Sequence, residues 1–310
     1  MSGAPVEIAA QVVRWQAEHG RNQLPWQNTR DAYRVWLSEI MLQQTQVVTV
    51  LEYYARFLAR FPDVRQLAAA PQDEVLALWS GLGYYSRARN LHRCAQIVVA
   101  EHGGEFPRTV HELAALPGIG RSTAGAIAAF CYGVRAPILD ANVRRVLTRA
   151  LGFGADLAEA RNERALWSLA EALLPDTDLA STMPRYTQGL MDLGAGICLP
   201  RSPCCMLCPL QPVCVAGRAG DAERYPVRTR KLKRRAEAWW LLLRQDRAGR
   251  LWLERRAPVG IWAGLYCPPV YASRRDLEEA LMPEVLPEVQ DLPAFTHVLT
   301  HRDLHLHPVL

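Results

Sequence analysis

A short cysteine-rich segment constrains the fold of this chain more than any other feature of its sequence. Five of the eight cysteines lie within 17 residues, and four of them, Cys198, Cys205, Cys208 and Cys214, are separated by six, two and five residues. Clustered thiols of this kind indicate a loop that wraps around a metal centre. Four thiolates suit either Zn²⁺ or a [4Fe–4S] cluster, and their chemistry leaves both open. The adjacent Cys204 could exchange places with Cys205.

Length and composition bound the remaining possibilities. With 310 residues, half of them apolar, the chain is long enough for two domains with packed interiors. It has neither an N-terminal signal-like apolar segment nor an uninterrupted apolar run of about 18 residues, so we expect a protein that is neither secreted nor membrane-spanning. The net charge of +5 permits a polyanionic partner without requiring one.

The residue pattern divides the chain into two domains. Residues 1–222 show apolar residues three and four positions apart, interrupted by prolines and glycines, which predicts about ten helices with short connections. A basic segment over 223–236 is predicted to be a linker, because charge runs are usually solvated. Residues 237–310 contain short strand-like runs at 239–243, 251–253, 264–266 and 305–307, which predicts a separate α+β domain. Its last strand ends at Leu310 without a closing element, so we expect this domain to be incomplete.

Two glycines mark a turn between apolar helical segments. Gly118 and Gly120 flank Ile119, and a new helix begins directly afterwards with its unpaired N–H groups and the positive end of its dipole. This arrangement predicts a site for a phosphodiester. The alternative is an ordinary turn between helices.

Two carboxyl groups stand out from their surroundings. Glu39 lies in a strongly apolar helical segment, on one stripe with Gln43 and Gln46, whereas Asp140 opens a basic helix. Desolvation should raise the pKa of Glu39 and a helix N-terminus should keep Asp140 charged, a division of roles that suits cleavage of an N-glycosidic bond. Taken singly, Glu39 could belong to a solvated helix face and Asp140 could be a plain N-cap.

These motifs together resemble the helix-hairpin-helix DNA glycosylase superfamily and, within it, the MutY-type adenine glycosylases. The resemblance runs along nearly the whole chain. It rests on Leu24–Trp26, the Glu39 segment, Gly81–Arg89, Leu116–Ala126, Ile138–Val146, Met191–Ala195 and the cysteine loop. It implies a mainly α fold, with a two-part helix-hairpin-helix domain whose cysteine loop holds a [4Fe–4S] cluster rather than zinc, followed by a truncated α+β Nudix-like domain.

The resemblance also implies roles for individual residues. Glu39 would protonate adenine and later help to activate water, and Asp140 would stabilise the oxocarbenium ion. Arg21, Trp26 and Gln188 would line the pocket for the extruded base. For Trp26, considered without the resemblance, ordinary core packing is the simpler interpretation.

Further residues are implied to contact DNA. Gln44 and Tyr84 would enter the duplex where the base leaves, although core packing is the simpler interpretation of Tyr84 alone. Ser122 occupies the place at which endonuclease III-like relatives carry a lysine nucleophile, which favours a monofunctional glycosylase. Arg144, where the family often has lysine, keeps the charge without the amine nucleophile.

The C-terminal domain resembles the Nudix-like module that reads 8-oxoguanine in such enzymes. A family Phe-Ser-His element corresponds here to Leu299, Thr300 and His301, which keeps the hydroxyl and loses the aromatic ring. The implied partner is duplex DNA with adenine opposite 8-oxoguanine or guanine, bound by a monomer. We therefore expect an intracellular protein, nucleoid-associated in the cytoplasm of a bacterium or nuclear in a eukaryote.

Three alternatives remain at this stage. A bifunctional lyase for oxidised pyrimidines would need an amine nucleophile, and a non-catalytic DNA-binding module would need neither Glu39 nor Asp140. A Nudix phosphohydrolase would need a metal-binding glutamate box, which the sequence does not show.

Overall fold

The computed structural model describes residues 4–229 and 234–310, which belong to two compact units that divide between Thr229 and Arg230. Each unit is described by itself. The predicted linker over 223–236 spans this division, and its residues Arg230, Lys231 and Lys233 lie outside the described residues. The predicted domain boundaries stay predictions.

The first unit is helical, as predicted. Its described helices are α1 (Ala4–His19), α2 (Ala32–Leu42), α3 (Val47–Arg60), α4 (Val64–Ala69), α5 (Gln72–Leu78), α6 (Ser86–His102), α7 (Val110–Ala115), α8 (Arg121–Tyr132), α9 (Ala141–Leu151), α10 (Ala160–Ala172), α11 (Leu179–Gly196) and α12 (Val215–Ala219), with short 3-10 turns at Cys205–Leu207 and Ala222–Arg224. Within the described residues, every helix is too short or too polar to cross a lipid bilayer.

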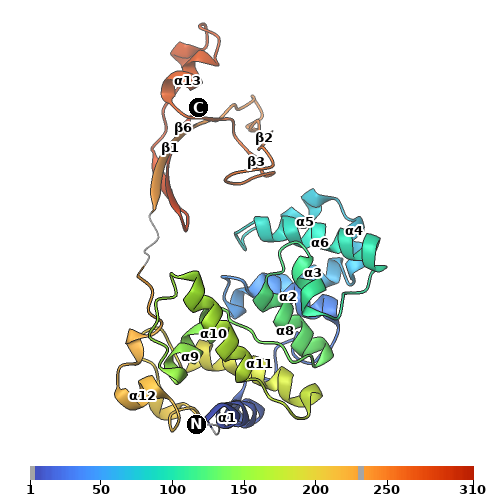
Figure 1. The fold of residues 1–310 in the computed structure, drawn as a ribbon. Coiled ribbons are helices and arrows are strands. Elements are labelled where there is room, and N and C mark those ends of the chain that lie inside the picture. Colours follow the sequence, from blue (N-terminus) through green and yellow to red (C-terminus); the bar gives the residue numbers. More distant parts are fainter. Residues whose placement is uncertain (1–3, 230–233) are drawn as a thin grey trace. The chain divides into compact units, whose positions relative to one another are not determined.

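The helices form two groups (Figure 1). The group α2–α8 packs around fully buried aromatic rings, among them Trp36, Phe57 and Trp79. The other group, α1 with α9–α11, packs around an apolar cluster that includes Leu147 and Leu190 and that also takes in part of α8. Helix α8 thus contacts both α2 and α11 and joins the two halves.

Small residues let these helices approach closely. Glycine at position 194 lies on α11 where that helix crosses α9, and a Cβ there would lie 2.6 Å from the Cβ atom of Asn142. On α8, a Cβ at Gly125 would lie 2.5 Å from the carbonyl oxygen of Pro137. A side chain at Gly125 or Gly194 would collide with the segments next to Asp140. The position of this carboxyl group therefore depends on glycine at these two positions.

The second unit contains a four-stranded sheet in the order β4-β1-β6-β5. Strands β1 (Arg235–Leu242) and β6 (Arg302–Val309) are parallel, while β4 (Val270–Tyr271) and β5 (Phe295–Val298) are antiparallel to their neighbours. A separate pair, β2 (Glu254–Arg255) with β3 (Tyr266–Cys267), helix α13 (Arg274–Glu279) and a short 3-10 turn at Leu286–Glu288 complete the regular elements among the described residues.

The α+β prediction for this unit is confirmed, with two differences in strand position. The run at 251–253 forms only an isolated bridge at Leu251, and β2 starts at Glu254. The run at 264–266 begins as a strand only at Tyr266, because Gly264 adopts a left-handed φ of 72°. The parallel register pairs Trp240 with His307, whose rings stack 4.6 Å apart.

The close crossing at Gly194 gives a test of the packing. We expect Gly194→Ala to lower the free energy of unfolding by about 1–3 kcal/mol, because the new methyl group meets the Asn142 side chain and backbone. Gly196→Ala on the same helix meets nothing within 4 Å and should be neutral or slightly stabilising. Urea unfolding of both variants measures the difference, and equal stabilities would contradict the packing argument.

Candidate active site

A cavity of about 720 Å³ lies between the two groups of helices in the first unit. Its wall comes from α1, the loop after it, α2, α8 and α11. The lining side chains include Gln16, Asn22, Trp26, Gln27, Arg30, Ser38, Glu39, Phe130, Pro184, Arg185 and Gln188. Of the predicted site residues, Glu39, Trp26 and Gln188 are therefore brought together at one cavity, although they are 162 positions apart in the sequence at most.

Glu39 is the acidic residue of this cavity wall. It lies on α2 among the buried residues Trp36, Leu37 and Ile40, and helix α2 begins at Asp31, whose side chain accepts a hydrogen bond from the Tyr33 N–H. Burial raises the pKa of Glu39 to about 8, and the negative charge of Asp140 adds to the shift. A carboxyl group with this pKa holds a proton at neutral pH and can donate it.

Asp140 is the N-cap residue of α9. Its Oδ1 atom accepts hydrogen bonds from the N–H groups of Asn142 (2.7 Å) and Val143 (2.8 Å). These bonds, together with Arg145 and Arg144, favour the carboxylate, but burial outweighs them and raises the pKa of Asp140 above its ordinary value. Asp140 is near enough to Glu39 for its charge to disfavour ionisation of Glu39, so we consider the two carboxyl groups as a pair. Asp140 itself is not among the residues that line the cavity.

Ser122 lies beside this pair. Its hydroxyl oxygen accepts a hydrogen bond from the Leu139 N–H at 3.0 Å, one residue before Asp140. The first turn of α8 is thereby tied to the segment that presents Asp140.

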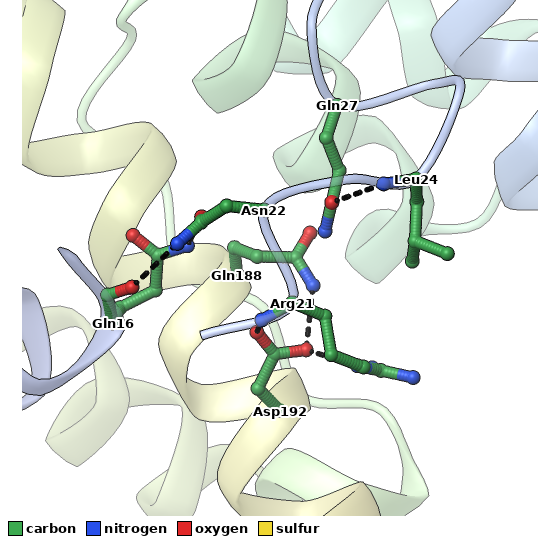
Figure 2. A network of polar contacts seen from close by, with 7 residues as sticks. All are labelled: Gln16, Arg21, Asn22, Leu24, Gln27, Gln188 and Asp192. Atoms are coloured by element: carbon green, nitrogen blue, oxygen red, sulfur yellow. Dashed lines mark hydrogen bonds and ion pairs between the residues drawn. The ribbon is translucent and has the colours of Figure 1, made fainter. Parts of the chain in front are cut away.

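A polar network supports the opposite wall of the cavity (Figure 2). The Gln188 amide donates from Nε2 to Oδ1 of Asp192 at 2.8 Å. Arg21 donates from Nε to the same oxygen at 2.6 Å and from its backbone N–H to Oδ2 at 3.0 Å. Arg21 is thus linked to the cavity through Asp192 and is not among the residues that line it. The role of Asp192 was missed, although a carboxylate within the apolar stretch Met191–Ala195 was a usable signal.

A proline inside α11 shapes the same wall. Pro184 has no N–H, so the Ala180 carbonyl one turn earlier lacks its helical donor. Arg30 replaces that donor, with Nη2 at 3.0 Å from the Ala180 carbonyl oxygen. Sequence reasoning gave no role to Arg30 or Pro184, and the proline within a helical pattern was the available signal.

Gln44 and Tyr84, the two residues predicted to enter the duplex, line a separate hollow of about 250 Å³ together with Gly118. Both adopt left-handed backbone conformations, with φ of 59° and 48°. The buried Arg87 guanidinium holds the two loops together by donating to the carbonyl groups of Gln43 (2.6 Å) and Gly83 (3.2 Å). Tyr84 is 43% exposed, which argues against plain core packing for this residue, whereas Trp26 is buried at the cavity wall and its ring packs on Tyr54.

The predicted helix-hairpin-helix turn joins α7 to α8. Gly118 needs to be glycine, because its φ is 78° and a Cβ would lie 2.9 Å from the Cβ atom of Asn90. Gly120 is the N-cap of α8 with an ordinary φ of −84° and open space around its Cα. The conformational argument for paired glycines therefore holds for Gly118 alone.

The four predicted metal ligands surround one small apolar cavity. Cys198, Cys205, Cys208 and Cys214 line it, whereas Cys204 is exposed and lies outside it. Burial, with a contribution from the neighbouring thiols, raises the pKa of Cys208 to about 11.

Two N–H groups point at these sulfur atoms. Arg149 donates from Nη1 to Sγ of Cys198 and Gly217 donates from its backbone N–H to Sγ of Cys214, both at 3.3 Å. In the described part of the chain, no three acidic, histidine or cysteine side chains are arranged to hold a single metal ion. Four thiols around one cavity fit a thiolate-ligated metal group, because buried thiols ionise readily only beside a positive centre.

Thr300 and His301 belong to the second unit. They are exposed in the turn between β5 and β6, where the Leu299 N–H donates to the Arg302 carbonyl and the His301 carbonyl accepts from the Arg235 N–H.

Two family models match the chain. Residues 37–172 match the HhH-GPD superfamily base excision DNA repair protein model, and residues 238–310 match the NUDIX domain model. Among solved structures, a thermostable thymine-DNA glycosylase aligns with a TM-score of 0.62 and 29% identity, over 70% of this chain and 97% of that one. A non-covalent endonuclease III–DNA complex aligns with a TM-score of 0.55 at 22% identity, over 68% of this chain and 94% of that one, which shows a shared fold.

Curated relatives align with most of this chain. The adenine DNA glycosylase of Buchnera aphidicola subsp. Acyrthosiphon pisum is 36% identical over 305 residues, which cover 96% of this chain and 85% of that protein. The adenine DNA glycosylase of Homo sapiens is 41% identical over 222 residues, which cover 69% of this chain and 40% of that protein. With its buried acid pair, its hairpin and its Nudix-like second unit, the chain therefore belongs to the adenine DNA glycosylase family of the helix-hairpin-helix base-excision repair superfamily.

Proposed function

We propose that this protein hydrolyses the N-glycosidic bond of adenine mispaired with 8-oxoguanine or guanine in duplex DNA. One observation carries the proposal: Glu39, with a pKa of about 8, lines a cavity of about 720 Å³ that is large enough for a purine, and the charge of Asp140 acts on Glu39. The names of the relatives support adenine as the base that is removed.

The proposed reaction uses the two carboxyl groups in different states. Glu39 donates its proton to a ring nitrogen of the extruded adenine, so the base leaves neutral as the C1′–N bond breaks. The Asp140 carboxylate, held by the Asn142 and Val143 N–H groups, stabilises the positive charge on the sugar. Water then adds to C1′ and gives a proton to the Glu39 carboxylate, which restores the acid.

We propose a hydrolytic enzyme without strand-cleaving activity. Ser122 cannot form a Schiff base, and its hydroxyl is bound to the Leu139 N–H. Arg144 pairs with Glu163 at 2.7 Å, and its guanidinium offers no amine nucleophile.

The DNA contacts in this proposal come from both units. The N-terminus of α8 behind Gly118 and Gly120 would bind a backbone phosphate, and Gln44 and Tyr84 would fill the space left by the extruded base. Thr300 and His301 in the second unit would read 8-oxoguanine on the other strand. We infer that a monomer acts on the duplex inside the cell.

We further propose a [4Fe–4S] cluster held by Cys198, Cys205, Cys208 and Cys214. Their common apolar cavity and the two N–H groups directed at sulfur support thiolate ligation of an iron–sulfur group. When bound, such a group supplies positive charge that stabilises four thiolates and closes the loop that follows α11.

The Glu39→Gln variant tests whether Glu39 is the proton donor. The amide cannot donate a carboxyl proton, so single-turnover excision from an adenine:8-oxoguanine duplex should fall by about 10²–10⁴-fold. Glu52→Gln makes the same chemical change on the exposed face of α3 and should leave the rate unchanged. Excision by the Glu39 variant at the wild-type rate would overturn the proposal, as would borohydride trapping of wild-type enzyme on DNA in high yield.

The rate should also depend on pH in a predictable direction. The pKa of Glu39 is raised to about 8, so the proton is present below pH 8 and is lost above it, and the excision rate should fall about tenfold per pH unit there. An acid limb should follow protonation of Asp140, at a higher pH than for an ordinary aspartate because its pKa is raised. Single-turnover rates between pH 5 and 10 give the profile, and a rate that rises through pH 9 would contradict the assignment of Glu39.

Substitution of the adjacent Cys205 and Cys204 gives a test variant and a matched control for the cluster assignment. Cys205→Ser should reduce the iron content and the broad visible absorption of the purified protein, because it removes a ligand from the thiol-lined cavity. Cys204→Ser should change neither, because Cys204 is exposed and outside that cavity. Wild-type protein that contains zinc and shows no visible absorption would overturn the cluster assignment.

A further inference from the structure

We propose that Asp192 sets the direction of the Gln188 amide, so that the cavity presents a hydrogen-bond acceptor to the 6-amino group of adenine and disfavours purines with a 6-oxo group. This inference rests on the proposed function and adds a positioning residue that fixes its base specificity.

The hydrogen bonds from Arg21 fix the Asp192 carboxylate as an acceptor. Asp192 is 4% exposed, and its carboxylate accepts two hydrogen bonds from Arg21. The backbone N–H of Arg21 donates to Oδ2 and the Arg21 Nε–H donates to Oδ1. A backbone N–H and a guanidinium can only donate, so both Asp192 oxygens act as acceptors. The contact with Arg21 at 2.6 Å is an ion pair as well as a hydrogen bond.

The acceptor role of Asp192 in turn fixes the direction of the Gln188 amide. The group that contacts Asp192 Oδ1 at 2.8 Å must be a donor, and so it is the Nε2 end of the amide. Figure 2 shows the Oε1 atom on the other side of the amide group from Asp192. Because Gln188 lines the cavity and is only 9% exposed, the amide has little room to turn over. The carbonyl end is therefore the part of Gln188 available to a base.

A second glutamine of the cavity wall has the opposite polarity. The Gln27 Oε1 atom accepts a hydrogen bond from the Leu24 N–H at 3.0 Å, and a backbone N–H cannot bond to the amide nitrogen in that way. The Gln27 Nε2 atom is buried and has no hydrogen-bond partner among the described residues. An unpaired buried donor of this kind is costly unless a ligand or water satisfies it.

Together the two amides offer an acceptor and a donor to the same cavity. On its N7 edge, adenine carries a 6-amino donor beside the N7 acceptor, which is the complementary pair, whereas a 6-oxopurine presents acceptors at both O6 and N7. An acceptor that faces the Gln188 carbonyl would leave both groups without a hydrogen bond in a buried site. Reversal of the Gln188 amide would remove this discrimination, and Asp192 opposes that reversal.

Asp192→Asn tests the inference, because an asparagine can donate as well as accept and so permits both directions of the Gln188 amide. Single-turnover excision is measured on two duplexes that carry adenine or hypoxanthine opposite the same base. We expect the preference for adenine over hypoxanthine to fall about tenfold, the size expected for one buried hydrogen bond. Asp178→Asn, at the exposed start of the same helix, should leave the preference unchanged.

A double variant reverses the polarity of the pair. In Gln188→Glu with Asp192→Asn, the asparagine amide can donate to the glutamate while its oxygen accepts from the Arg21 backbone N–H, and an acceptor again faces the cavity. We expect this variant to recover most of the preference for adenine that Asp192→Asn loses. Recovery would not follow if Asp192 served only to stabilise the fold.

Equal losses of activity on adenine and hypoxanthine in Asp192→Asn, measured on folded protein, would overturn the inference while leaving the proposed function in place. If that variant does not fold, Gln188→Met decides the matter, because it removes the acceptor and leaves Asp192 paired with Arg21. An unchanged preference in Gln188→Met would overturn the inference. Wild-type protein that excises no adenine from either mispair would instead overturn the proposed function.

Discussion

The proposed chemistry depends on the desolvation of one carboxyl group, that of Glu39, beside the charge of Asp140. Desolvation and the neighbouring negative charge raise the pKa of Glu39 to about 8, so the acid holds a proton where most carboxyl groups have lost theirs. Desolvation also raises the pKa of Asp140, but two backbone N–H groups and nearby arginines favour its ionised form. The packing of α2 and α9 through α8 therefore produces two carboxyl groups that differ in their tendency to ionise.

The rest of the first unit holds this pair and the cavity in position. Gly125 and Gly194 let α8 and α11 approach the segment around Asp140 more closely than any larger residue would allow. Arg30 donates to the Ala180 carbonyl, which lacks its helical donor because of Pro184. Asp192 accepts hydrogen bonds from both Arg21 and Gln188. The Gln188 amide of the cavity wall is thus oriented by Asp192, which does not itself line the cavity, as expected for a preorganised binding site.

The two remaining parts of the chain differ in how they are stabilised. The cysteine segment has little apolar core of its own, and its thiols surround a small cavity, so a bound cluster would contribute directly to its folding. The second unit rests on a β1–β6 parallel pair and a small buried cluster of Leu242, Leu277 and Val309. The predicted Thr300 and His301 lie in an exposed turn of that unit.

By itself, the sequence determined the helical character of the first unit and the α+β character of the second, because these follow from local periodicity, and its motifs of neighbouring residues identified the family. Glu39 stood out by its apolar surroundings, whereas Trp26 and Gln188 were predicted as pocket residues only through the resemblance to that family. Only the tertiary structure decided that Cys205 rather than Cys204 faces the other thiols, that burial raises the pKa of Asp140 as well, and that Arg21 acts through Asp192. Each of these depends on contacts between residues far apart in the chain, for example the 171 positions between Arg21 and Asp192, and no local pattern encodes them.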